Sequence, residues 1–178
     1  MTSKISVRAL YLSAAAAAFL TGAGPAAAAS TTQPLTGTAL ETIAIVGAPA
    51  TFTTNFQAGS TATTAGVLTA TDTNNSWSLT VSDAATGTPG HMVAATLGCS
   101  GSEAKLQNPL SVSVTSPLSG VTSAGAVSIS GSPQTVASAT SQPLAASILT
   151  TNYSQTINSG ETLLTGCVYS LTATYTLQ

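Results

Sequence analysis

Residues 167–177 read CVYSLTATYTL, and this stretch decides the fold class because apolar and hydroxyl-bearing side chains alternate along it. Successive side chains of a β-strand point to opposite faces, so strict alternation predicts a strand with one buried face and one polar face. We therefore expect a single long strand here, whose inward face carries Cys167, Tyr169, Leu171, Ala173, Tyr175 and Leu177.

The same alternation recurs along the chain. Residues 76–82 read SWSLTVS, which predicts a strand with Trp77, Leu79 and Val81 facing inward. Turn-forming Gly, Pro and Asn residues separate such segments, as in an antiparallel sandwich. We expect an all-β fold, a single antiparallel β-sandwich of the Ig-like or Greek-key type over residues 40–178. Shorter strands are expected around Ile43 and Ile45, Phe52 and Phe56, Val112 and Val114, and Val127 and Ile129, and a short helix at residues 140–150 remains an alternative.

Charged residues are scarce, which excludes several functions. The chain of 178 residues has three Lys or Arg and five Asp or Glu. A nucleic-acid-binding protein needs many basic side chains to neutralise phosphates, so we expect no nucleic-acid partner. An intrinsically disordered chain combines low hydrophobicity with high net charge, whereas 43% of these residues are hydrophobic and the formal net charge is −2. A folded domain with a surface of hydroxyl and amide groups is expected.

The first residues have the layout of a secretory signal peptide. Lys4 and Arg8 precede an apolar stretch at residues 9–20, and small Ala residues follow at 26–29. The apolar stretch is shorter than the roughly 20 residues that a membrane helix needs. We therefore expect a cleaved signal peptide at 1–29, a flexible arm at 30–39, no membrane span, and a secreted product that is extracellular or associated with the cell wall. The Ala-rich leader indicates a high-GC Gram-positive bacterium, such as one of the actinobacteria.

Two cysteines remain after the predicted cleavage, Cys99 and Cys167. Secreted proteins meet oxidising conditions, so a disulfide between the two is the simplest prediction. Two free buried thiols, or a metal held by the pair, are the alternatives. A zinc site needs four ligands, and the only histidine does not form a tight motif with either cysteine. We expect no bound metal and no cofactor.

No catalytic motif stands out. His91 follows Pro89 and Gly90 without a Gly-x-Ser-x-Gly elbow, so a hydrolase using His91 is a third hypothesis behind two non-enzymatic ones. Residues 72–75 (Asp-Thr-Asn-Asn) offer oxygens for a cation, but they lack the spacing of the known calcium loop and are better interpreted as a turn. We expect the protein not to be an enzyme.

The aromatic residues favour a packing role. Exposed rings would suit stacking on sugars, yet most rings here occupy apolar-face positions of alternating segments. Tyr153, between Asn152 and Ser154, is the ring expected at the surface. Core packing is expected for Phe52, Phe56, Trp77, Tyr169 and Tyr175.

Two segments together resemble the WxL domain of Gram-positive cell-surface proteins. Residues 71–81 read TDTNNSWSLTV, which is similar to the first motif, a Trp-x-Leu after an Asp-rich turn. Residues 169–177 read YSLTATYTL, which is similar to the C-terminal motif, with Tyr175 where the family has a second Trp. The resemblance implies a β-rich domain that attaches non-covalently to peptidoglycan or to other surface proteins. The residues at its motif positions are Trp77, Leu79, Tyr169, Tyr175 and Leu177.

These features lead to two functional hypotheses. The first is a secreted, non-enzymatic bacterial cell-surface protein that binds the cell wall or surface partners non-covalently. The alternative is a subunit that assembles with copies of itself into a fibre or surface layer, because a low-charge, Thr-rich β-chain with a free arm can add a strand to a neighbour. The second hypothesis implies a homo-oligomer.

Overall fold

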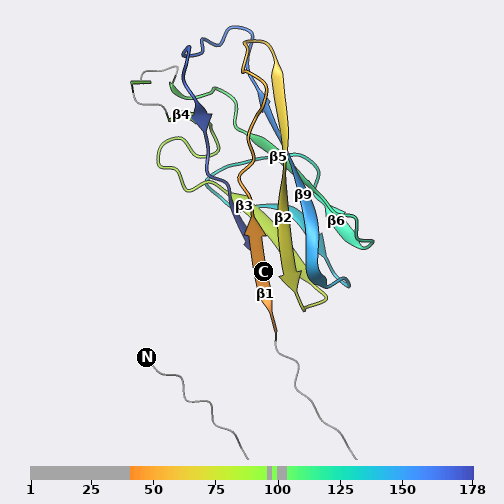
Figure 1. Cartoon of the computed structure of the whole chain (residues 1–178). Helices are drawn as coiled ribbons and strands as arrows, with labels where there is room; N and C mark the ends of the chain where they lie inside the picture. Colours follow the sequence, from red (N-terminus) through yellow and green to blue (C-terminus); the bar gives the residue numbers. More distant parts are fainter. Residues whose placement is uncertain (1–40, 96–97, 100–103) are drawn as a thin grey trace, which may run out of the picture. The chain divides into compact units, whose positions relative to one another are not determined.

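The computed structural model describes residues 41–95, 98–99 and 104–178 (Figure 1). The regular elements named in this part of the chain are strands paired in an antiparallel manner, so the all-β prediction is confirmed. The described residues form one compact unit. The predicted signal peptide and the predicted arm lie outside the described residues.

The strands form two larger sheets and one small one. The first sheet has five strands in the order β1 (Ile43–Gly47), β2 (Thr61–Asp72), β9 (Leu144–Thr156), β5 (Ser111–Thr115) and β7 (Val127–Ser128). The second has four strands in the order β11 (Thr174–Leu177), β3 (Trp77–Ser82), β8 (Gln134–Ala139) and β6 (Val121–Ser123). A two-stranded sheet pairs β10 (Tyr169–Ser170) with β4 (Val93–Ala94).

The connections explain how the sheets hold together. Only β1 and β2 are neighbours both in sequence and in a sheet. Strand β2 pairs with β9 in the first sheet, while the strands next to them along the chain, β3 and β8, pair in the second. The chain therefore passes from one sheet to the other between strands, as in sandwiches with Greek-key connections.

A single hydrophobic core lies between the two larger sheets. Leu68, Val114 and Leu149 reach it from the first sheet, and Leu79 and Val136 reach it from the second. Alternate residues of β3 face this core, as the sequence pattern predicts. Two sheets that share one core form a sandwich.

Trp77 fastens the start of β3. Its side chain is 3% exposed, and its indole Nε1 donates a hydrogen bond of 2.6 Å to the carbonyl of Gln142. The backbone N–H of Gln142 in turn donates to the carbonyl of Asn75. Asp72 Oδ1 accepts the N–H of Asn74, so residues 72–75 form the predicted turn. These bonds join that turn to the connection between β8 and β9.

The prediction of one long strand at residues 167–177 is wrong. The segment contributes β10 to the small sheet and β11 to the second sheet, and residues 171–173 belong to neither. Its exposure nevertheless alternates without a break, with every inward residue more buried than its neighbours. The physical reason is that alternating side chains indicate an extended backbone and show which side chains point inward. They do not determine which strand the backbone pairs with, because that depends on tertiary contacts.

Two further local predictions are corrected. Phe52 and Phe56 do not lie on a strand but in the connection between β1 and β2. Residues 140–150 contain no helix, because β9 begins at Leu144 and pairs along most of its length with β2. Pairing on both sides of β9, with β2 and β5, outweighs the weak local preference of this Ala-containing stretch.

Replacing Trp77 with Ala should lower the free energy of unfolding by about 3 to 5 kcal/mol, because it removes a large buried ring and leaves a cavity. Urea unfolding followed by circular dichroism measures this loss. Thr176→Ala, an exposed change on the adjacent strand β11, is the control and should be nearly neutral. A loss near zero for Trp77→Ala would contradict the core position of the ring.

Candidate functional site

An open groove with a volume of about 1210 Å³ is a prominent concave feature of the described residues. It lies between the connection at residues 48–60, the inward face of β2 and β9, and the C-terminal segment from Leu163 to Tyr175. Ligand sites are usually concave, mostly apolar and a few hundred to about 1,000 Å³ in volume. This groove is therefore the first candidate for a functional site.

The groove exists because β1 is much shorter than β2. Strand β1 pairs only with the last part of β2, from Leu68 to Asp72. Beside residues 61–67 of β2 the place of an edge strand is taken by residues 48–56, which we call the strap (Figure 1). Within the described part of the chain the strap forms no backbone-to-backbone hydrogen bond. Its carbonyl at Thr51 accepts a bond of 2.8 Å from Thr64 Oγ1.

Gly66 allows the strap to lie close to β2. A Cβ atom at this glycine would lie 2.8 Å from Thr151 Oγ1 and 3.2 Å from the Cβ of Ala50. The second distance is unusually tight for a carbon contact, so a side chain at position 66 would press on the strap. The lack of a side chain at Gly66 thus leaves room for both Thr151 and the strap.

Aromatic rings gather in this groove. Phe52 and Phe56, both half-buried on the strap, meet edge to face with ring centroids 5.3 Å apart. Phe56 also lies 6.2 Å from the ring of Tyr169. Tyr153 and Tyr175 complete the set, so every aromatic residue of the described chain except Trp77 lines the groove. Tyr169 belongs to the buried core, as expected, while Phe52, Phe56 and Tyr175 are only partly buried and pack against it.

Tyr153 and Tyr175 join the two sheets at the groove. Tyr153 projects from β9 and Tyr175 from β11, and their hydroxyl oxygens lie 2.9 Å apart in a hydrogen bond. Burial, followed by the hydrogen bond with Tyr153, raises the pKa of Tyr175 well above its ordinary value. The prediction that Tyr153 lies at the surface is wrong, because its ring is half-buried and packs against the core.

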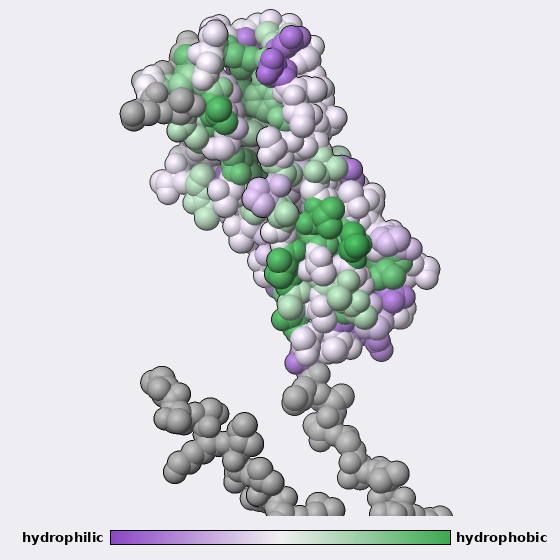
Figure 2. All heavy atoms as spheres, viewed as in Figure 1, coloured by the Kyte–Doolittle hydropathy of each residue, from purple (hydrophilic) through white to green (hydrophobic). Residues whose placement is uncertain are grey.

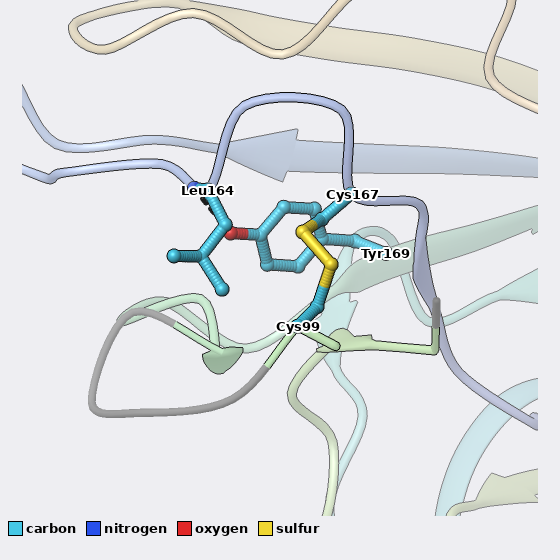
Figure 3. The surroundings of a disulfide bond; sticks show 4 residues. All are labelled: Cys99, Leu164, Cys167 and Tyr169. Atoms are coloured by element: carbon cyan, nitrogen blue, oxygen red, sulfur yellow. Dashed lines mark hydrogen bonds between the residues drawn. A yellow bond between two sulfur atoms is a disulfide. The ribbon is translucent and has the colours of Figure 1, made fainter. Parts of the chain in front are cut away.

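The disulfide fixes the wall opposite the strap (Figure 3). Cys99 and Cys167 are bonded, with their Cα atoms 6.1 Å apart, as predicted. The Tyr169 hydroxyl accepts the backbone N–H of Leu164 at 3.1 Å, and the N–H of Cys167 donates to the carbonyl of Leu164. The N–H of Ala95 donates to the carbonyl of Val168. Residues 164–169 are thereby held to a distant part of the chain.

The motif residues fall into two groups. Trp77, Leu79 and Leu177 are core side chains, and Leu79 lies directly opposite Leu177 where β3 pairs with β11. The two segments that resemble the WxL motifs are therefore neighbouring strands. Tyr169 and Tyr175, in contrast, reach the groove.

The side chains of Asp83, Glu161 and His91 form hydrogen bonds with backbone groups of the loops. Both oxygens of Asp83 accept backbone N–H groups, from Ala85 and Gly90. Glu161 likewise accepts the N–H groups of Gln107 and Asn158. His91 Nδ1 lies 2.8 Å from the carbonyl oxygen of Leu106. Within the described ranges no three His, Cys, Asp or Glu side chains are placed to hold a metal ion.

None of the described residues that line the groove is charged. Its polar groups are Thr and Ser hydroxyls, the Asn55 amide and the tyrosine hydroxyls. This arrangement is suited to binding an uncharged molecule. Sequence reasoning missed the strap, although Pro49, which favours a break after β1, was a visible signal.

No family model, curated protein or solved structure matches this chain. Among the residues that the structure describes, no helix has the length and apolar character to cross a membrane.

Removing the disulfide with Cys99→Ser and Cys167→Ser together should lower the free energy of unfolding by roughly 4 kcal/mol, because the bridge closes a long loop and restricts the unfolded chain. Urea unfolding of the double variant measures this, with the unreduced wild type as reference. A change below about 1 kcal/mol would show that the bridge contributes little to stability.

Stability should fall as the pH rises above about 10, because unfolding lets Tyr175 ionise near its ordinary pKa while the folded state keeps the proton. This contribution is fully present below that pH and is lost above it. Urea unfolding between pH 8 and 11 measures the slope, and Tyr175→Phe should reduce it. An equal slope in the variant would contradict the assignment.

Proposed function

We propose that this chain is a secreted, non-enzymatic bacterial cell-surface protein that binds the cell wall or another surface protein non-covalently through the groove. The observation that carries the proposal is the aromatic lining of a large, open and uncharged concave surface. Aromatic rings supply much of the contact energy in binding sites because they bury a large area with few rotatable bonds.

The polar groups of the groove favour a binding function over a catalytic one. Acid–base chemistry needs a titratable side chain beside the reacting atoms, with a pKa near the working pH. Burial raises the pKa of Tyr175, which moves it away from neutrality. His91, Asp83 and Glu161 are engaged with backbone groups, as described above.

The resemblance to the WxL domain supports the same function. Its motif positions build the paired strands β3 and β11, and this pairing places Tyr175 at the groove. The disulfide agrees with the oxidising compartment that the predicted signal peptide implies. We accordingly place the protein outside the cell, with peptidoglycan or a surface protein as its partner.

Pelleting with purified cell walls tests this proposal. The processed chain should sediment with the walls, and Phe52→Ala combined with Phe56→Ala should reduce the sedimenting fraction at least threefold. Val46→Ala, which truncates an apolar side chain on the outer face of the sheet, is the matched control and should behave as the wild type. Recovery of all the wild-type protein in the supernatant would count against wall binding.

Self-assembly is the second candidate function, and one surface favours it. Val46, Ile148 and Val67 are 70%, 56% and 47% exposed. The strand register puts Val46, Thr69 and Ile148 in one row across β1, β2 and β9. We call Val46, Val67 and Ile148 the outer apolar patch, and Figure 2 shows hydrophobic residues on the surface around β1.

The outer apolar patch adjoins a sheet edge. Within the described residues β1 pairs only with β2, so its other side offers N–H and C=O groups to a further strand. An apolar face beside an open edge is a favourable place for a second copy to add.

Light scattering over a range of concentrations tests assembly. The wild-type mass should rise with concentration, and Val46→Lys should hold the protein at the mass of a monomer. Thr122→Lys adds the same charge at an exposed position of the other sheet and should leave assembly intact. A wild type that stays monomeric at high concentration would remove this function.

A further inference from the structure

The groove also indicates the chemical class of its ligand. This inference rests on the proposed function in one respect, which is that the groove is a binding site.

The absence of charge from the described lining excludes ionic ligand groups. A carboxylate or phosphate moved out of water needs a cationic partner, and burying it unpaired is costly. Lys105 is the single basic residue beyond the predicted signal peptide, and it is not among the lining residues. The ligand part that enters the groove is therefore uncharged.

The lining suits hydrocarbon better than a sugar polymer, so the ligand inferred below is an alternative to peptidoglycan in the groove. Sugars present many hydroxyl groups, and a site that desolvates them has to return a hydrogen bond to each. The groove offers the hydroxyls of Thr, Ser and Tyr residues and one side-chain amide, Asn55, which is exposed. Leu68, Met92, Leu110 and Leu171 contribute apolar surface that suits hydrocarbon instead.

An added peptide strand is disfavoured by the strap. A peptide that joins a sheet needs free N–H and C=O groups at a strand edge. Ala50 lies against the position where Gly66 of β2 lacks a side chain. Thr51 is bonded to Thr64 on the same strand. The strap therefore lies over the inward-facing positions 64 and 66 of β2, and a peptide entering the groove would meet it there.

The tyrosine pair supplies one hydrogen bond to a ligand. One hydroxyl donates to the other, so the second O–H of the pair remains free to donate. This single donor matches a ligand that is apolar apart from one hydrogen-bond acceptor, such as an ester carbonyl. We infer that the groove binds a neutral acyl lipid, with its hydrocarbon chain along Phe52, Phe56 and Leu171 and its ester group at Tyr153 and Tyr175.

Displacement of an uncharged fluorescent probe, N-phenyl-1-naphthylamine, tests the inference on the processed chain. The probe should gain fluorescence on binding, and a neutral monoacylglycerol below its aggregation limit should displace it. The fatty acid anion of equal chain length should displace it at least tenfold less well. A neutral oligosaccharide of N-acetylglucosamine should leave the probe bound.

Variants that remove the tyrosine hydroxyls test the hydrogen bond to the ligand most directly. Tyr153→Phe or Tyr175→Phe alone leaves one hydroxyl with a free O–H, so the affinity for monoacylglycerol should change less than twofold. The double Phe variant has no donor left at this position, so its affinity should fall about 3- to 10-fold, the usual range for one hydrogen bond. Val46→Ser on the outer apolar patch is the control and should bind as the wild type does.

Several results would overturn the inference. These are no displacement by monoacylglycerol, equal displacement by the fatty acid anion, displacement by the oligosaccharide, or an equal loss in Val46→Ser and the double Phe variant. Sedimentation with walls in a protein that binds no monoacylglycerol would overturn the lipid inference alone. Binding of monoacylglycerol without sedimentation would support the inference and count against wall attachment.

Discussion

Burial of the inward-facing side chains of β3 is the interaction on which the rest of the structure depends. This strand lies between β8 and β11, so it fixes the second sheet from both sides. Trp77 locks its first residue to the connection between β8 and β9, and Leu79 and Val81 are fully buried. With five acidic and three basic residues in the whole chain, ion pairs are too few to replace this apolar contact.

The groove is a consequence of how the sandwich ends. The short β1 leaves part of β2 without a paired neighbour, and the strap fills that place with rings in place of a hydrogen-bonded strand. On the opposite wall, the disulfide and the bond between Tyr169 and Leu164 hold an irregular segment in place. The Tyr153–Tyr175 bond joins the two sheets at the groove. A rigid frame thus surrounds a surface that is only partly packed, which is the usual setting of a binding site.

The sequence allowed prediction of the fold class, the facing of residues 167–177 and the disulfide, because each depends on local alternation or on compartment. It did not allow prediction of the break between β10 and β11. The alternating inward positions are compatible with pairing in the small sheet and with pairing in the second sheet. The strap was missed for a related reason. Phe52 and Phe56 have the spacing of inward residues on a strand, but the backbone between them has no strand to pair with. Tyr153 was misplaced because its polar neighbours in sequence say nothing of Tyr175, which meets it across the sandwich.

The two functional surfaces differ in chemistry. The groove is concave and ringed by aromatic residues, whereas the outer apolar patch is a row of aliphatic side chains on a sheet face. Binding in the groove and association through the patch are therefore separable by substitution.

The most direct measurement of the central claim, that the groove is the binding site, is NMR of the aromatic side chains during titration with a neutral monoacylglycerol. Resonances of Phe52, Phe56, Tyr153 and Tyr175 should shift together with one dissociation constant, while the indole of Trp77 stays unchanged. Shifts that are absent from these four rings, or that centre on Val46 and Ile148, would contradict it.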